Sequence, residues 1–490
     1  MIKLAENESF MLIKQKSKTF LLSSFLISSV LFSQAHNVSE GYVKPDDPLV
    51  VQNLEQWQDL KFGLFMHWGT YSQWGIVESW SLCPEDESWT QRKPEHGKSY
   101  NEYVKNYENL QTTFNPIGFN PQKWANAAKK AGMKYVVFTT KHHDGFAMFD
   151  TKESDYKITS PRTPFSKNPK ADVTKEIFNT FRNDGFKIGA YFSKPDWHSE
   201  NYWWPYFPPK DRNVNYDPKK YPERWNSFKK FTFNQLNEIT SNYGKIDILW
   251  LDGGWVRPFH TIDPAVEWQR TIKVEQDIDM DKIGKMARKN QPGIIIVDRT
   301  VPGKWENYIT PEQAVPEHAL SIPWESCITM GDSFSYVPND NYKSSQKIIE
   351  TLIKIISRGG NYLMNIAPGP NGDYDAVVYD RLKEISNWME KNQSAVFATR
   401  GIAPYHEGDL YYTRSKDGKT VNVFHISEKA EYKAPANLTF SVPENFKPKT
   451  LQILGIQSTI EWRQNGDKIE VTIPQNRTAL QYAMVIQMKK

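Results

Sequence analysis

Several short apolar runs of the chain end in side chains that could do chemistry. His67 lies at the end of the first run, His142 and His143 follow the second, Asp252 ends the fourth, and Arg299 follows the fifth. Imidazole, carboxylate and guanidinium groups gathered in one place can bind a polyhydroxylated ligand, and a pair of carboxyl groups among them can act as acid, base or nucleophile. This combination of residue types favours a polar pocket for a sugar.

Each of these residues also has a structural explanation when it is considered alone. An aspartate after a strand is more often a helix cap or part of a turn than a catalytic group. Neighbouring histidines such as His142 and His143 could be metal ligands or a buried, hydrogen-bonded pair. No His-x-x-x-His or cysteine-rich spacing accompanies them, so we expect neither a metal ion nor a cofactor.

The elements that would position these side chains are short strands alternating with helices. Near-continuous apolar runs predict strands that are buried on both faces, as in a parallel sheet. These runs cover residues 61–68, 134–140, 187–193, 246–252, 293–298 and 361–366. Trp124, Ala127, Ala128 and Ala131 repeat with helical spacing between two of them. The pattern predicts an α/β fold, a (β/α)8-like barrel over residues 36–400, irregular because not all eight strands are readable. Catalytic groups of such barrels lie at the carboxyl ends of the strands.

The pattern changes at Gly401, after a predicted helix at residues 375–393. Short alternating runs at residues 420–427, 438–442 and 468–473 are separated by Asp-Gly, Asn-Gly and proline turn signals. We predict a C-terminal antiparallel β-sandwich over residues 401–490, which either buttresses the barrel or binds carbohydrate.

Composition excludes some classes of protein. The 490 residues include 61 Lys or Arg and 57 Asp or Glu, and this near balance argues against a nucleic-acid-binding surface. Aromatic residues make up 14% of the chain, which is far too many for a disordered protein. Cys83 and Cys327 are the only cysteines, so a disulfide scaffold is excluded, and we favour two buried thiols over a pair.

The N-terminal residues are typical of export. Lys14, Lys16 and Lys18 precede an apolar stretch at residues 20–32, and Ser33-Gln34-Ala35 resembles a cleavage site. We predict a signal peptide over residues 1–35, with Met11 as a possible true start, and a periplasmic or secreted protein. No second long apolar run exists, so no membrane span is expected.

The motifs HWG, KHHDGF, WLDGG, VDR, TPEQ, PWESC and GGNYLMNIAP occur in that order. Together they resemble glycoside hydrolase family 29, the exo-acting α-L-fucosidases, over roughly residues 50–400, and the C-terminal sandwich also fits. The resemblance implies a retaining hydrolase that removes terminal α-L-fucose from oligosaccharides or polysaccharides.

The resemblance also implies roles for individual residues. Asp252 matches the catalytic nucleophile. The residues that match a substrate-binding pocket are His67, Glu78, His142, His143, Tyr191, Trp250, Arg299 and Phe334. The general acid/base is less well fixed: we predict Glu312, with Glu325 as the alternative and Glu306 as a weaker one.

Two other functions and one unusual segment remain open at this stage. The chain could be a glycan-binding relative without catalytic activity, or an enzyme for sulfated fucan oligosaccharides. Residues 255–280 look like an insertion on the catalytic rim, and their aromatic side chains could pack the loop or touch the substrate. The sequence does not predict the oligomeric state.

Overall fold

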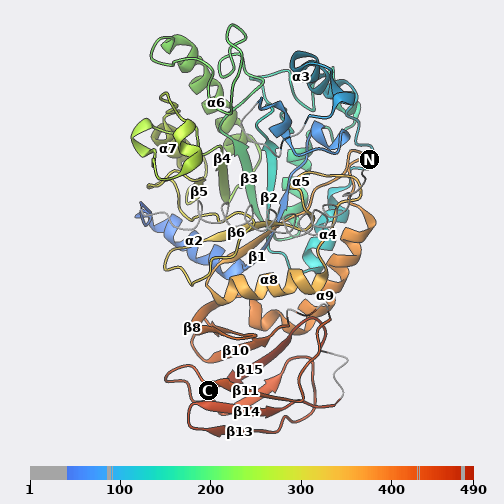
Figure 1. Cartoon of the computed structure of the whole chain (residues 1–490), viewed down its shortest axis with the longest axis vertical. Coiled ribbons are helices and arrows are strands. Elements are labelled where there is room, and N and C mark those ends of the chain that lie inside the picture. The colour runs from blue at the N-terminus through green and yellow to red at the C-terminus, as the bar shows by residue number, and fades with distance from the viewer. Residues whose placement is uncertain (1–40, 85–89, 91, 428, 430, 476–479) are drawn as a thin grey trace, which may run out of the picture.

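The computed structural model of the protein describes residues 41–490 except 85–89, 91, 428, 430 and 476–479. The predicted signal peptide at residues 1–35 lies outside the described residues. Figure 1 shows a helix-wrapped sheet at one end of the molecule and a smaller all-β part at the other, with helices α8 and α9 between them.

The larger part is built around seven parallel strands in the order β5-β4-β3-β2-β1-β7-β6. They are β1 (Phe62–Met66), β2 (Tyr135–Lys141), β3 (Lys187–Ser193), β4 (Ile248–Asp252), β5 (Ile295–Asp298), β6 (Glu325–Thr329) and β7 (Asn361–Asn365). Their side chains are almost all buried, as expected for strands covered on both faces. The prediction of a curled parallel barrel followed by antiparallel sheets is confirmed.

An irregular segment, residues 306–313, joins the two outer strands of this sheet. Glu306 pairs with Val297 of β5, and Glu312 pairs with Cys327 of β6. Asn307 N–H donates to Ile296 O at 2.9 Å, and Gln313 N–H donates to Cys327 O at 2.9 Å. The segment takes the place of an eighth strand without forming a regular one, which is why only part of the barrel pattern is visible in the sequence.

Helices cover the outside of the sheet (Figure 1). They are α2 (Pro48–Leu60), α3 (Tyr100–Asn109), α4 (Pro121–Lys130), α5 (Val173–Asn183), α6 (Pro222–Asn242), α7 (Met280–Asn290), α8 (Ser345–Ser357) and α9 (Ala376–Val396). Helix α4 shows why they form: the Asn120 side chain caps it, Pro121 occupies its first turn, and Trp124 and Ala128 bury one face. The predicted helical spacing here is confirmed.

The smaller part contains two antiparallel sheets, in the orders β12-β15-β10-β9-β8 and β11-β14-β13. Their strands are β8 (Thr399–Glu407), β9 (Leu410–Ser415), β10 (Thr420–His425), β11 (Asn437–Ser441), β12 (Thr450–Ile453), β13 (Trp462–Asn465), β14 (Lys468–Thr472) and β15 (Met484–Lys489). Apolar side chains from both sheets form a separate core.

The five-stranded sheet packs on helices α8 and α9. Trp388 Nε1 donates to Ala483 O at 3.1 Å, and Gln346 Nε2 donates to Ser427 O at 3.0 Å. Phe424 and Val485 are completely buried members of the same apolar cluster as the helices. These contacts support the buttressing role of the sandwich.

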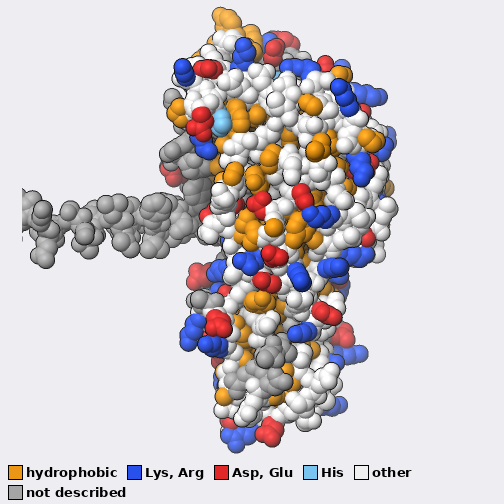
Figure 2. All heavy atoms as spheres, turned by 90° about the vertical axis from the view of Figure 1, so that its right-hand side faces the viewer, with side chains coloured by type: hydrophobic (Ala, Val, Ile, Leu, Met, Phe, Trp, Pro, Cys, Tyr) orange, Lys and Arg blue, Asp and Glu red, His pale blue; other side chains and the backbone are white. Residues whose placement is uncertain are grey.

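Three further features bear on the expectations from the sequence. Cys83 and Cys327 are both buried and do not form a disulfide with each other, as favoured above. Among the described residues, no helix combines the length and apolarity needed to cross a membrane. Acidic and basic side chains are intermixed on the face shown in Figure 2.

Candidate active site

Asp252 is the last residue of β4, and its carboxylate lies at the carboxyl end of the barrel. Oδ1 accepts a hydrogen bond from Arg299 Nη1 at 3.0 Å, and Oδ2 accepts one from the Tyr191 hydroxyl at 2.8 Å. Burial alone would raise the pKa of Asp252, but the Arg299 charge and hydrogen bonds from Gly253 N–H and Tyr191 hold it well below its usual range. Asp252 is therefore ionised at neutral pH.

The Arg299 guanidinium connects two carboxylates. Its Nη1 binds Asp252, its Nη2 binds Glu312, and its Nε donates to Thr310 Oγ1 at 3.0 Å. The face of the guanidinium lies 5.1 Å from the Trp250 ring centroid. Arg299 thus brings together the predicted nucleophile and the predicted acid/base. The Glu312 side chain keeps 34% of its surface exposed, so it can reach a substrate.

Two histidines present an unprotonated nitrogen because of what their other nitrogen binds. The Ser193 hydroxyl donates to Pro195 O at 2.9 Å, so it accepts from His143 Nδ1–H at 2.5 Å. The Asn365 side-chain oxygen likewise accepts from His67 Nδ1–H at 2.8 Å. Nε2 of each ring is left as a hydrogen-bond acceptor, and that of His143 lies 3.9 Å from Asp252 Oδ2.

All three predicted histidines are buried and close together. The His142 ring centroid lies 4.1 Å from that of His143 and 5.6 Å from that of His67, and Ser79 Oγ contacts His142 Nδ1 at 2.5 Å. Burial is the main reason that the pKa of His67 falls to about 4 and that of His143 to about 3, and it lowers the pKa of His142 as well. The rings are therefore neutral at pH 7.

Aromatic side chains form the floor and one wall of the site. Tyr191 stacks on Trp250 with a centroid distance of 5.3 Å, and both are fully buried. Phe334, from the loop after β6, lies 4.9 Å from His67 between ring centroids. Asn365 Nδ2 holds this loop by donating to Phe334 O at 2.7 Å.

Glu78 is a buried carboxyl group from the loop after β1. Burial raises its pKa to about 8, and the Glu312 charge adds to this rise, although hydrogen bonds from Ser335 oppose it. Its Oε1 atom is buried without a hydrogen-bond partner. Glu78 is therefore protonated at neutral pH and can act as a donor in the site.

The two alternative acid/base residues are placed differently from Glu312. Glu325 begins β6 and is completely buried inside the barrel, where Tyr135, Tyr308 and Trp250 donate hydrogen bonds to it. Glu306 is 2% exposed and pairs with β5. Of the three glutamates, Glu312 alone has a side chain that is both bonded to Arg299 and partly exposed.

Three residues that support this site were not singled out from the sequence: Ser79, Thr310 and Asn365. Asn365 ends an apolar strand, so the strand-end rule that selected Asp252 could also have selected it, and the same rule does point to Ser193 at the end of the third run. Ser79 directly follows Glu78, and Thr310 lies shortly before Glu312. Both residues are in short irregular segments, and nothing in their local sequence identifies them.

A family model described as alpha-L-fucosidase matches residues 29–394. The chain belongs to this family. The alpha-L-fucosidase of Branchiostoma floridae is 26% identical over 475 residues, which cover 91% of this chain and 96% of that protein. The plasma alpha-L-fucosidase of Homo sapiens is 25% identical over 449 residues, covering 87% of each chain.

Solved structures of other family members have the same fold. Alpha-L-fucosidase isoenzyme 1 from Paenibacillus thiaminolyticus superposes with a TM-score of 0.71 at 26% identity, over 90% of this chain and 99% of that one. A family 29 alpha-L-fucosidase from Bacteroides thetaiotaomicron, trapped as a covalent intermediate with 2-fluoro-fucosyl fluoride, gives a TM-score of 0.70 at 22% identity, over 93% and 98% of the two chains.

The predicted insertion at residues 255–280 forms a rim beside this candidate site. Arg257 is buried and donates to Gly254 O, to Gln269 Oε1 at 3.1 Å and to Thr300 O at 2.7 Å. Trp255 is 4% exposed and packs behind His143 at a centroid distance of 5.0 Å. Trp255 thus packs the loop, which was one of the two alternatives for this segment.

His142, His143 and Asp252 place three potential metal ligands within 4.8 Å of one another. Both Asp252 oxygens already accept hydrogen bonds, from Arg299 and Tyr191. The positive guanidinium beside Asp252 also disfavours a cation there. A metal-free site stays a prediction.

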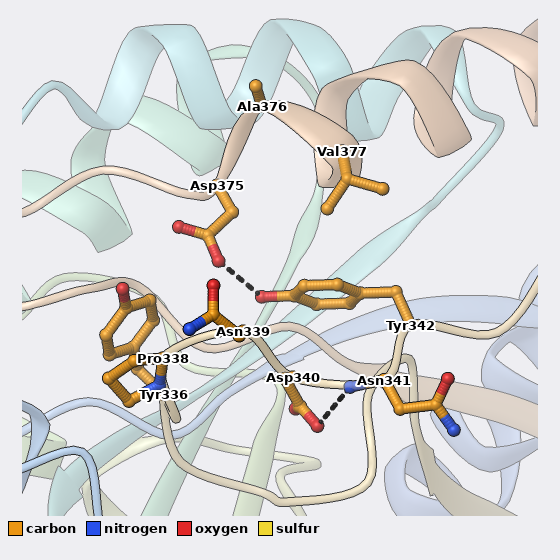
Figure 3. Close-up of a pocket in the computed structure, with 9 residues that line it drawn as sticks. All are labelled: Tyr336, Pro338, Asn339, Asp340, Asn341, Tyr342, Asp375, Ala376 and Val377. Atoms are coloured by element: carbon orange, nitrogen blue, oxygen red, sulfur yellow. Dashed lines mark hydrogen bonds between the residues drawn. The ribbon is translucent and has the colours of Figure 1, made fainter.

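A separate surface pocket lies outside the site (Figure 3). It has a volume of about 490 Å³ and is lined by the loop after β6 and the first residues of α9. The Tyr342 hydroxyl donates to Asp375 at 3.1 Å across it. None of the residues predicted to bind fucose lines this pocket.

Proposed function

We propose that the protein is an exo-acting retaining α-L-fucosidase that hydrolyses terminal α-L-fucose from glycans. The observation that carries this proposal is the single guanidinium of Arg299 bound to both Asp252 and Glu312. One guanidinium can hold two carboxylates only when their oxygens are a few ångströms apart. Such a pair is compatible with the separation of about 5–5.5 Å of retaining glycosidases, the mechanism that the family resemblance implies, whereas inverting ones use roughly 6.5–9.5 Å.

In the first step Asp252 attacks the anomeric carbon. The bond from that carbon to the leaving oxygen breaks, and Glu312, which acts in its protonated form rather than as the carboxylate paired with Arg299, gives its proton to this oxygen. The product is a fucosyl ester of Asp252. The covalent intermediate trapped in the Bacteroides thetaiotaomicron enzyme supports such a step here. Asp252 suits this role because Arg299 and Tyr191 keep it ionised.

In the second step Glu312 acts as a base. Its carboxylate takes a proton from water while the water oxygen attacks the anomeric carbon, and the ester bond to Asp252 breaks. Fucose leaves with its original anomeric configuration. The partial exposure of Glu312 gives it access to both the leaving group and water, whereas Glu325 is sealed inside the barrel.

The histidines bind the sugar rather than carry protons. Nε2 of His67 and of His143 accepts a hydrogen bond from a sugar hydroxyl, and protonated Glu78 can donate one. A site that pairs buried polar groups with particular hydroxyls rejects sugars that lack them. Phe334 supplies an apolar contact for the sugar.

The N-terminal sequence supports export, so we infer that the substrate is met in the periplasm or outside the cell. The natural substrate class would be a fucosylated oligosaccharide or polysaccharide. The relatives are named as α-L-fucosidases, which specifies the sugar but no linkage.

An aryl α-L-fucoside tests the proposal. We expect release of the aryl group, and NMR of the nascent sugar should show the α-anomer of fucose first. Initial formation of the β-anomer would contradict retention. Binding of fucose without any release would instead identify a non-catalytic relative, and turnover confined to sulfated fucan fragments would favour the fucan-directed alternative.

A further inference from the structure

Glu325 is a carboxylate buried in the barrel interior without a positive partner. It is 0% exposed, and within the described part of the chain no Lys, Arg or His forms an ion pair with it. Burying a carboxylate is costly unless charge or hydrogen bonds compensate. An apolar residue would fill the same space at a lower cost in free energy. The presence of Glu325 at this position therefore calls for a functional explanation.

Three donors from different parts of the barrel compensate the carboxylate. The Tyr135 hydroxyl of β2 donates to Oε2 at 2.5 Å. The Tyr308 hydroxyl, from the irregular segment 306–313 that closes the barrel (the closing segment), donates to Oε1 at 3.1 Å, and Trp250 Nε1 of β4 donates to Oε1 at 3.3 Å. Glu325 itself belongs to β6, beside the closing segment. The carboxylate therefore ties together the strands on both sides of the irregular closure.

Trp250 connects this carboxylate to the proposed reaction centre. It lies two residues before Asp252 in β4, so both side chains point to the same side of the sheet. The Arg299 guanidinium lies over its ring at 5.1 Å, and Tyr191 stacks on it. Arg299 and Tyr191 are the two side chains that donate to the Asp252 carboxylate.

We propose that Glu325 is a positioning residue that fixes Trp250, and through it the Arg299 and Tyr191 side chains that orient and charge Asp252. Burial raises the pKa of Glu325 to about 7, although hydrogen bonds from Tyr135, Tyr308 and Trp250 oppose this rise. In its ionised form the carboxylate at the indole N–H also makes the ring face more attractive to the guanidinium above it. The proposal rests on the proposed function, because it assigns a role within that same site. It replaces the acid/base role considered for Glu325 from the sequence.

The test compares E325Q with the wild type on aryl α-L-fucosides whose leaving groups differ in acidity. E325Q keeps the size of the side chain but replaces one of the two acceptor oxygens with an amide and cannot ionise. We expect kcat to fall about 10- to 100-fold with every leaving group, while KM changes less than about twofold, because the hydroxyl-binding histidines are untouched.

A second pair of variants separates positioning from folding. Y135F removes one donor to Glu325, and we expect a smaller loss of kcat, about 3- to 10-fold, again with unchanged KM. Y362F is the matched control, because Tyr362 is a fully buried tyrosine of the neighbouring strand β7 whose hydroxyl has no hydrogen-bond partner. Y362F should keep the wild-type kcat. If E325Q does not fold, the Y135F and Y362F pair decides.

The outcomes are distinct. Wild-type kcat in E325Q or Y135F, with an active wild type, overturns the positioning role and leaves the proposed function intact. A loss in E325Q that is large for poor leaving groups, absent for good ones and rescued by azide would make Glu325 the acid/base instead. A wild type that releases no aryl group overturns both proposals.

Discussion

Arg299 sets the charges of the candidate site. Its guanidinium is nearly buried between Asp252 and Glu312 and lies on the Trp250 face. When a substrate expels water from the site, a charge fixed in this way acts more strongly on the reacting groups than it would in water. The arrangement keeps one carboxylate ionised and leaves the other accessible, which is the division of labour that retaining hydrolysis needs.

Glu78 gives a prediction about stability and pH. Its pKa is about 8 in the folded protein and about 4.5 when unfolded, so the folded state retains a proton that the unfolded state loses. The stabilisation from the protonated carboxyl is complete below pH 4.5 and is lost as the pH rises to about 8. We expect E78Q, which cannot ionise, to gain on the order of a few kcal/mol relative to the wild type between pH 5 and 8.

Urea denaturation of both proteins at pH 5, 6.5 and 8 measures this difference. E78Q should also retain more activity than E78A, because its amide keeps a hydrogen-bond donor in place. Parallel pH dependence of the two unfolding free energies would show that Glu78 is not held protonated.

The sequence identified most of the groups that meet at the site but could not rank its carboxylates. His142, His143 and Asp252 stand out because they end apolar strands. Glu312 and Glu325 both lie in short polar stretches, and only the fold reveals that one is partly exposed and the other sealed.

The strands that carry the site differ in how visible they are in the sequence. Strand β3 has the predicted bounds, because residues 187–193 are nearly all apolar and buried. Strand β6 was missed, since the sequence ESCIT contains three polar residues that are buried by hydrogen bonds rather than by hydrophobicity. The closing segment 306–313 has no periodicity at all, because it pairs through isolated bridges.

The rim formed by the insertion at residues 255–280 gives a prediction at the scale of a single structural element. Arg257 holds two short 3-10 helices of this segment, Phe259–Thr261 and Glu267–Thr271, by donating to Thr261 O and Gln269 Oε1, and it also donates to Thr300 O. We expect R257M to lose about 2–4 kcal/mol of stability, because it leaves these buried acceptors unpaired. Limited proteolysis should cut the variant within this segment faster than the wild type.

The control for this prediction is R270M, at an exposed position of the same segment. Equal rates of cutting in R257M and the wild type would contradict the role of Arg257.

The barrel and the sandwich share an apolar interface, which gives a prediction for the whole molecule. Trp388 of α9 is 4% exposed and donates to Ala483 beside β15. We expect W388A to cost about 3–5 kcal/mol, because a large buried side chain is removed and Ala483 O loses its donor. Chemical denaturation measures the loss, while kcat of the folded variant should stay within about twofold. If W388A had the same unfolding free energy as the wild type, the sandwich would not support the barrel through this contact.

The most direct measurement of the central claim is the rate of D252G on an aryl α-L-fucoside, with and without azide. We predict that D252G keeps the wild-type circular dichroism spectrum, loses at least about a thousandfold in kcat, and forms β-L-fucosyl azide when azide takes the place of the missing carboxylate. A D252G protein that hydrolyses the substrate at the wild-type rate without azide would show that Asp252 is not the nucleophile.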